Sequence, residues 1–293
     1  MSNILVTGAT GALGNAVINA LLSKTKTDTL SIMVRDSKKA EDLKGKGVDV
    51  RTGDYGDYTS LLSAFKGIDK LYFVSGNDIV NRAKQQENVV KAAKEAGVKH
   101  ILYTSIERHN ETETSPLVFI ADAHLKTENW IKESGMAYTI LKHNLYMDIL
   151  PMFIGDKVLE TGTIFLPAGE GKTAFTLRQD MAEVSAVILT TDGHENKVYD
   201  ISTDAAVSFS EIAAAISKIS GKQISYISPA PEEFVKALTD AGVPEQFVGM
   251  TAGFAEGIKQ QEFNKTSDII ERLTGRKPFT VNEYLKETYF SKN

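Results

Sequence analysis

The sequence predicts a doubly wound α/β fold, in which helices cover both faces of a parallel sheet. Ile4, Leu5 and Val6 form a short apolar run that is typical of a strand buried on both faces. Glycines follow this run at three-residue intervals, and a helical pattern of apolar residues comes after them. As far as about residue 150, short apolar runs then alternate with helical stretches, which is the pattern of a parallel sheet.

The first part of the chain contains six expected strands. They cover residues 4–6, 29–34, 48–51, 71–74, 100–104 and 137–141. We expect a helix after the glycines, and further helices at 38–44, 58–65, 82–96 and 123–133. Because parallel crossovers are right-handed, this alternation predicts a three-layer domain over residues 1–150.

The second part, residues 151–293, is expected to be a smaller α+β region that packs on the first and completes a substrate cleft. Its expected strands cover 162–165, 175–177, 197–201 and 224–227, and its expected helices cover 180–189, 212–219, 232–240 and much of 245–275. Ser208 and Glu211 form a capping-box pattern at the start of one of these helices. No linker rich in glycine or serine separates the two parts.

Composition argues against several classes of function. The 293 residues include no cysteine, which excludes disulfides, thiolate catalysis and cysteine metal sites. A net charge of −5 argues against nonspecific nucleic-acid binding, which needs a basic face. The first strand begins at residue 4 and no apolar run nears membrane-spanning length, so we expect no signal peptide and no membrane segment. The expected location is the cytoplasm.

Gly8, Gly11 and Gly14 predict a phosphate-binding turn. Strand, glycine turn and helix in this order bring backbone N–H groups and a positive helix end together, as a pyrophosphate requires. Gly8 suits the tight turn, Gly11 lets phosphates approach the backbone, and Gly14 lets the helix pack closely on the strand. The spacing is GxxGxxG rather than GxGxxG, and a purely structural glycine turn is the alternative interpretation.

Arg35 ends the second expected strand, where an NAD-binding domain usually carries an acid for the ribose 2′-hydroxyl. A guanidinium suits a 2′-phosphate instead, and Lys38 and Lys39 add positive charge. A solvated basic turn is the alternative. Asp36 comes next and is able to bind a ribose hydroxyl, so the sequence favours NADPH without excluding NADH.

Small polar residues follow two further strands. Ser75, Gly76 and Asn77 come after the fourth strand, and Thr104 and Ser105 end the fifth. The carboxyl ends of the strands face the ligand in this fold, so we expect these residues near the nicotinamide half of the cofactor. Helix capping is the alternative role for each of them.

The Tyr-x-x-x-Lys pair with which many short-chain dehydrogenases protonate a carbonyl is absent from its usual helix. The one literal match, Tyr138 and Lys142, lies in an expected strand, where the spacing is about 13 Å. On a helix the same spacing would be about 6 Å. The helix that normally carries the pair has His124 and Lys126 and no tyrosine.

His124 is the candidate proton donor, with a hydrogen bond to Glu128 at i+4 as the alternative role. His143 and Asn144 follow the sixth strand and are expected at the same ligand edge. The other histidines have no neighbour at ligand spacing, so we expect no metal site. The sequence also has no Gly-x-Ser-x-Gly motif of the α/β-hydrolases.

Seven segments carry a resemblance to the atypical short-chain dehydrogenase/reductases of the NmrA-like group, and within it to the bacterial type 2 NAD(P)H:quinone oxidoreductases. They are residues 6–14 (VTGATGALG), 53–61 (GDYGDYTSL), 87–99 (ENVVKAAKEAGVK), 103–105 (YTS), 124–128 (HLKTE), 134–139 (SGMAYT) and 168–172 (AGEGK). Together they span essentially the whole chain. The family also lacks the Tyr/Lys pair.

The resemblance implies NADP(H) binding by the glycine loop, the residue after the second strand and the segments after the fourth and sixth strands. Those positions are Gly8, Ala9, Thr10, Gly11, Ala12, Leu13, Arg35, Ser75, Gly76, Asn77, His143, Asn144, Leu145 and Tyr146. The chain has Lys-His-Asn-Leu at 142–145 where the family has a run of the Arg-Asn-Gly-Trp type. The family's aromatic residue beside the nicotinamide is thus replaced by Leu145, whereas Tyr146 is kept.

Two functions follow from these observations. In the first, NADPH passes hydride directly to a quinone or a similar small electrophile without a flavin. A quinone needs little acid catalysis because the hydroquinone anion is delocalised, which suits a site without the Tyr/Lys pair. In the second, the protein is a non-catalytic NADP(H)-binding redox sensor that acts through a protein partner. A homodimer is a possible assembly in either case.

Overall fold

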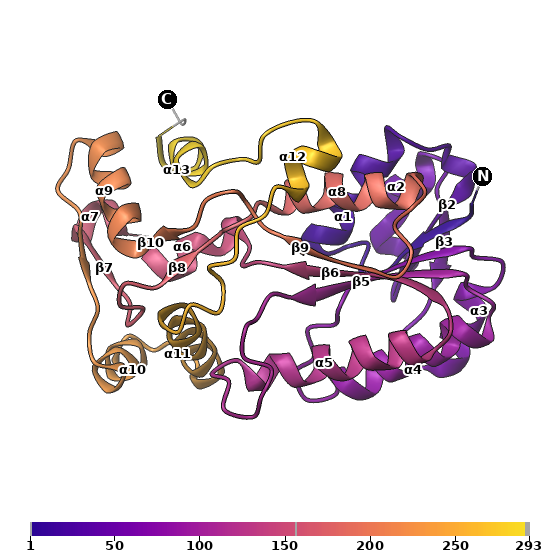
Figure 1. Cartoon of the computed structure of the whole chain (residues 1–293), viewed down its shortest axis with the longest axis horizontal. Coiled ribbons are helices and arrows are strands. Elements are labelled where there is room, and N and C mark those ends of the chain that lie inside the picture. Colours follow the sequence, from indigo (N-terminus) through magenta and orange to yellow (C-terminus); the bar gives the residue numbers. More distant parts are fainter. Residues whose placement is uncertain (1, 156, 291–293) are drawn as a thin grey trace.

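The structure, a computed structural model, describes residues 2–155 and 157–290. At its centre lies a seven-stranded parallel sheet with the order β3-β2-β1-β4-β5-β6-β9 (Figure 1). Its strands are β1 (Ile4–Val6), β2 (Leu30–Val34), β3 (Asp49–Thr52), β4 (Lys70–Phe73), β5 (His100–Ile106), β6 (Ala137–His143) and β9 (Lys197–Ile201). This arrangement confirms the expected doubly wound parallel α/β fold.

Helices cover both faces of the sheet (Figure 1). One face carries α1 (Ala12–Leu22), α8 (Arg178–Thr190) and α12 (Ile269–Thr274). The other face carries α3 (Tyr58–Phe65), α4 (Arg82–Glu95) and α5 (Val118–Glu133). The short helix α2 (Glu41–Gly45) and the 3₁₀ turns η1 (Thr27–Thr29) and η2 (Ser37–Ala40) lie along the connections on either side of β2.

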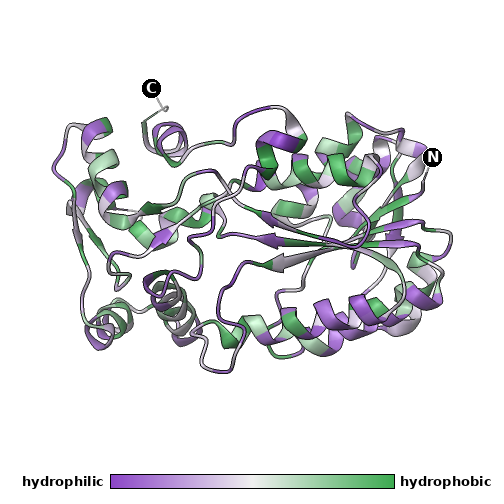
Figure 2. Ribbon diagram, in the orientation of Figure 1, coloured by the Kyte–Doolittle hydropathy of each residue, from purple (hydrophilic) through white to green (hydrophobic). Residues whose placement is uncertain are grey.

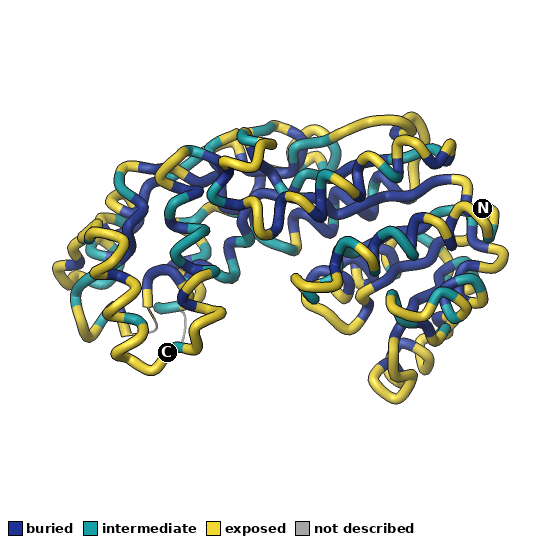
Figure 3. Tube along the Cα trace, turned by 90° about the horizontal axis from the view of Figure 1, so that it is seen from below, coloured by how far each residue is buried: buried dark blue, intermediate teal, exposed yellow. Residues whose placement is uncertain are grey.

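Each face of the sheet has its own apolar core. Val17 and Leu21 of α1 pack with Ile32 on one face, and Phe65 and Val90 pack in the cluster on the other. Buried segments run along the sheet and exposed ones lie outside it (Figure 3). The flanking helices carry both hydrophobic and hydrophilic residues (Figure 2), because each has one buried and one solvated face.

The strand order reverses between β2-β1 and β4-β5, so β1 lies at the switch point of the sheet. Ile4 is in register with Leu30 of β2 on one side and with Lys70 of β4 on the other. The connections after β1 and β4 leave toward opposite faces, which opens a crevice at the carboxyl ends of these strands. The fold therefore places the expected ligand site at this edge.

A second group of elements forms a distal region on the left of Figure 1. It has two small sheets, one of β8 and β10 and one of β7 and β11. The elements are the 3₁₀ turn η3 (Met147–Ile149), α6 (Leu150–Ile154), α7 (Val158–Thr161), β7 (Thr163–Phe165), β8 (Lys172–Thr173), β10 (Val207–Ser208), α9 (Phe209–Ser220), β11 (Ser225–Ile227), α10 (Pro231–Asp240), α11 (Glu245–Lys259) and α13 (Val281–Phe290). The rings of Phe153, Phe175 and Phe209 meet in its core.

The chain returns from the distal region to the sheet over residues 178–201. Helix α8 packs against α1, and β9 pairs with β6 as the seventh strand. The division into 1–150 and 151–293 therefore remains a proposal, and any such division has to assign α8 and β9 to the sheet.

The structure corrects several expected elements. The helix expected at 123–133 begins earlier, at Val118, and the helix expected at 38–44 is divided into η2 and α2. Strands β5 and β6 each extend two residues further than expected. The capping box of Ser208 and Glu211 is confirmed, with hydrogen bonds in both directions.

The strand expected at 175–177 is wrong. The two-residue strand lies at Lys172–Thr173, and Thr176 makes only an isolated bridge with Tyr146. Phe175 is fully buried in the distal core, and Leu177 precedes α8. Phe175 and Leu177 are therefore apolar because they lie in the segment that leads into α8, and not because they form a strand.

Candidate active site

The glycine turn is held together by a close backbone contact. A Cβ on Gly14 would lie 2.2 Å from the carbonyl oxygen of Gly8, so only glycine fits there. Gly8 itself has a φ of 62°, which favours glycine. Gly11 has extended backbone, and its N–H donates to the Gly8 carbonyl at 2.9 Å. Gly8 and Gly14 thus have the conformation and the close packing that the sequence predicts, and the role of Gly11 toward a phosphate stays a prediction.

Helix α1 begins directly after this turn and has a free N-terminus. Among the residues that the structure describes, no side chain caps it, and its first turn contains no acidic residue. The unpaired N–H groups and the helix dipole favour an anion at this position. The end of the helix therefore fits a pyrophosphate.

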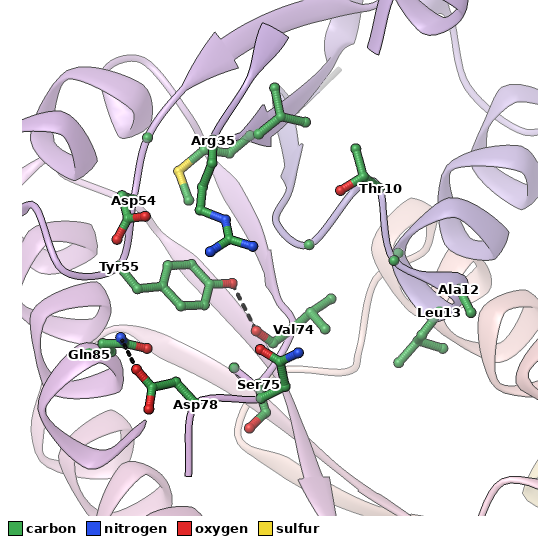
Figure 4. A pocket seen from close by; sticks show the side chains of 18 of the residues that line it. Thr10, Ala12, Leu13, Arg35, Asp54, Tyr55, Val74, Ser75, Asp78 and Gln85 are labelled. Atoms are coloured by element: carbon green, nitrogen blue, oxygen red, sulfur yellow. Dashed lines mark hydrogen bonds between the residues drawn. The ribbon is translucent and has the colours of Figure 1, made fainter. Parts of the chain in front are cut away.

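A pocket of about 530 Å³ opens at the switch point, next to this helix end (Figure 4). The volume is in the range of ligand sites. It is lined by Gly8, Thr10, Gly11, Ala12, Leu13, Gly14, Met33, Val34, Arg35, Gly53, Asp54, Tyr55, Val74, Ser75, Gly76, Asn77, Asp78, Gln85, Tyr146 and Arg178. Ten of the fifteen residues expected at the site are among these.

Arg35 follows β2, and its side chain extends into the pocket (Figure 4). In residues 2–155 and 157–290 its guanidinium has no hydrogen bond or ion pair, so all its donors are available to a ligand. Asp36 faces away, because its carboxylate accepts from the Lys38 N–H at 3.0 Å and caps η2. Neither Asp36 nor the two lysines line the pocket.

Tyr55 crosses the floor of the pocket and was not expected there. Its hydroxyl lies 2.6 Å from Thr7 Oγ1 and 2.8 Å from the Val74 carbonyl oxygen, so it joins the carboxyl ends of β1 and β4. Its ring meets Phe73 edge to face. Burial raises the pKa of Tyr55, so its hydroxyl stays protonated.

The loop after β4 is fixed from two sides. The Ser75 N–H donates to Thr104 Oγ1 at 2.8 Å, so Thr104 positions the loop rather than lining the pocket. Asp78 accepts from Gln85 at 3.0 Å (Figure 4). It also accepts from Asn81 at 2.9 Å. Ser105 points elsewhere and donates to Glu128.

Tyr146 and Arg178 form the wall at the other end of the pocket. The Arg178 guanidinium carbon lies 3.9 Å from the centre of the Tyr146 ring, as a cation–π contact requires. Arg178 also pairs with Asp148. Arg178 was not expected at the site, since it comes 32 positions after Tyr146 and only the fold brings them together.

Four of the expected cofactor-binding residues do not line the pocket. Ala9 is buried against the sheet, and Leu145 packs in the distal core. Asn144 donates to the Phe263 carbonyl and accepts from the Leu145 N–H. His143 is buried, which lowers its pKa to about 3, and neither ring nitrogen has a partner in the described part of the chain.

His124 lies beneath the site rather than in its lining. Its Nδ1 is 2.7 Å from the Tyr103 hydroxyl, which donates to Gln86 at 2.9 Å. The expected bond to Glu128 is absent, because Glu128 accepts from Ser105 and Arg108. Burial and the charges of Arg82 and Arg108 hold the pKa of His124 well below its usual value, so the imidazole is neutral near pH 7.

Two negative findings concern the same described residues. No group of three or more histidine and acidic side chains there is arranged to hold a metal ion. None of the helices in that part combines the length and apolar character needed to span a bilayer.

A parallel sheet with a glycine turn, a free helix N-terminus and a pocket at the switch point defines a dinucleotide-binding protein of the Rossmann type. The particular family is also clear, because the NmrA-like family model matches residues 1–285. The chain belongs to the NmrA-like family.

Individual relatives are similar over almost their entire lengths. The chain is 36% identical over 286 residues to quinone oxidoreductase 2 of Escherichia coli (strain K12), which covers 98% of each chain. It is 31% identical to the NAD(P)H azoreductase of Xenophilus azovorans, over 97% of this chain and 96% of the relative. The triphenylmethane reductase of Citrobacter sp., solved with NADP(H), superposes with a TM-score of 0.89 at 38% identity, over 97% of this chain and 99% of that one.

Proposed function

We propose that this chain is an NADPH-dependent oxidoreductase that transfers hydride directly to a quinone or a similar small electrophile, without a flavin. The observation that carries the proposal is the pairing of a free α1 N-terminus with an unpaired Arg35 in one pocket. A pyrophosphate and a 2′-phosphate are the two anionic groups of NADPH. The three relatives named above, a quinone reductase and two dye reductases, act on conjugated molecules according to their names.

Each part of the pocket has a role in holding the cofactor. The N–H groups of Ala12 and Leu13 would bind the pyrophosphate beside the backbone of Gly11, and Arg35 would bind the 2′-phosphate. The loop at 75–77 and Tyr146 lie at the nicotinamide half. The bound cofactor supplies the hydride, and the chain supplies position and charge.

The groups around the pocket favour a quinone over a ketone. Burial raises the pKa of Tyr55 and of Tyr103, and it lowers the pKa of His124 and of His143. None of these groups is thus a good proton donor near pH 7. A reduced ketone leaves a localised alkoxide that needs a donor, whereas a reduced quinone leaves a phenolate that solvent protonates later.

The first prediction concerns Arg35. Arg35→Ala removes charged hydrogen bonds worth about 1.5–3 kcal/mol, so NADPH should bind roughly 10- to 150-fold more weakly. NADH affinity should change far less, because NADH has no 2′-phosphate. Calorimetric titration of both cofactors measures the difference. Lys38→Ala is the control, since Lys38 lies on the same turn outside the pocket. Equal losses for NADPH and NADH would contradict the assignment.

The glycine turn offers a second test. A Cβ on Gly11 would lie 3.3 Å from the Gly8 carbonyl oxygen, a contact that a small shift relieves, and its backbone is extended. Gly11→Val should therefore fold but lose NADPH binding, because its side chain occupies phosphate space. Gly14→Ala is the matched contrast and should lower the unfolding midpoint instead. Unchanged NADPH affinity in folded Gly11→Val would refute the phosphate site.

Turnover tests the reaction class. The purified protein should be colourless and should oxidise NADPH steadily with 1,4-quinones, with little activity on simple ketones. Absorbance at the NADPH band, over a panel of quinones, ketones and aldehydes, measures this directly. NADPH binding without turnover on any acceptor would favour a redox sensor instead.

A homodimer and a cytoplasmic location remain predictions.

The fourth prediction concerns His124. His124 contacts Tyr103 and does not line the pocket. His124→Ala should therefore lower quinone turnover modestly, by less than the roughly 10²–10⁴-fold typical of an essential acid. Tyr103→Phe should have a similar effect, since it breaks the same hydrogen bond. The kcat of the wild type should show no histidine inflection between about pH 6 and 8. A ketone reductase activity that collapses in His124→Ala would show that this histidine replaces the missing tyrosine.

A further inference from the structure

Arg82 is a buried cation without a partner. It is the first residue of α4, the residue is 9% exposed, and its Nε is buried with no acceptor among the described residues. In the described part of the chain its guanidinium forms no hydrogen bond and no ion pair. Burial removes the hydration of a charge, so buried arginines are normally paired.

Arg108 shows the paired arrangement that is usual for a buried arginine. Its side chain is fully buried, and it lies 3.0 Å from Glu128 and 3.1 Å from Glu111. The acid whose charge acts on Arg82 is Asp78, but that carboxylate is engaged by Asn81 and Gln85. Arg82 therefore lacks the local compensation that a structural arginine has.

The backbone of α4 adds to the positive charge of Arg82. The N-terminus of α4 adds the positive end of a helix dipole, and its first turn has no acidic residue. Helical spacing puts Gln85 and Gln86 on the same side of α4, and Gln85 lines the pocket. Burial raises the pKa of Tyr146, which forms the wall of the pocket, and the positive charges of Arg178 and Arg82 act in the opposite direction. The unpartnered ring of His143 packs edge to face on Tyr146.

We propose that Arg82 and the N-terminus of α4 form an oxyanion site, which holds the substrate oxygen that becomes negative on reduction. This inference rests on the proposed function. A quinone that accepts a hydride gains two electrons and one proton, becomes a hydroquinone monoanion, and later takes a second proton from water, while NADPH becomes NADP⁺. The positive charge of Arg82 attracts the anionic product more strongly than it attracts the neutral quinone. Such differential binding speeds the reaction.

A phenol that titrates near neutral pH reports the site without turnover. In the wild-type complex with NADP⁺, para-nitrophenol should bind as the anion, with its pKa lowered by about one to three pH units. Arg82→Gln should abolish the shift, and Arg82→Lys should restore part of it. Lys84→Gln removes the same charge from the exposed side of the same helix and should leave the shift intact. Absence of the shift in the wild type, or its persistence in Arg82→Gln, overturns the inference.

Kinetics and stability complete the test. Arg82→Gln should lower kcat for 1,4-benzoquinone about 10²- to 10³-fold, as the loss of an oxyanion donor does, with NADP⁺ affinity unchanged. Its unfolding midpoint should equal or exceed that of the wild type, because an unpaired buried charge is removed. A lower midpoint together with an unchanged kcat would assign Arg82 a structural role and overturn the inference. A wild type that binds the phenolate but reduces no quinone would refute the proposed function alone.

Discussion

The contact between Gly14 and the Gly8 carbonyl is the constraint on which the rest of the site depends. Because no side chain separates them, α1 starts directly against the end of β1. That closeness directs the free N-terminus of the helix into the crevice where the strand order reverses. Tyr55 then joins the ends of β1 and β4 across the same crevice. The floor of the pocket and its anion-binding end therefore both depend on the backbone that directly follows β1.

Charges are distributed unequally along this edge of the sheet. Arg108 is neutralised by Glu128 and Glu111, and Arg178 is paired with Asp148. Arg35 and Arg82 have no such partners within the described residues, although one is exposed and the other buried. Pairing explains the first two arginines as structural or positioning groups. Of the two unpaired arginines, Arg35 lines the pocket, where a ligand phosphate would compensate its charge, and we propose that the reduced substrate does so for Arg82.

Local signals in the sequence predict the fold and the phosphate end of the site. The strand at 4–6, the glycine spacing and Arg35 all act over a few residues, so their roles follow from short-range physics. The places of Tyr55 and Arg178 in the pocket depend on packing between distant segments, for which the sequence has no local signal. The strand at 197–201 is predicted from its local pattern, but its pairing with β6 is not. His124 shows the same limit: Glu128 lies at ideal helical spacing, but it is paired with Arg108, and the imidazole contacts Tyr103 instead.

Leu145 stands where the resemblance to the family implies an aromatic residue, yet the pocket has an aromatic wall for a physical reason. Leu145 is 4% exposed and packs with the distal core, held there by the hydrogen bond from its N–H to Asn144. The backbone therefore turns this position away from the pocket and presents the next residue, Tyr146, to it. The aromatic surface at this end of the pocket is therefore the ring of Tyr146. Arg178 covers one face of that ring, and its ion pair with Asp148 holds it in place.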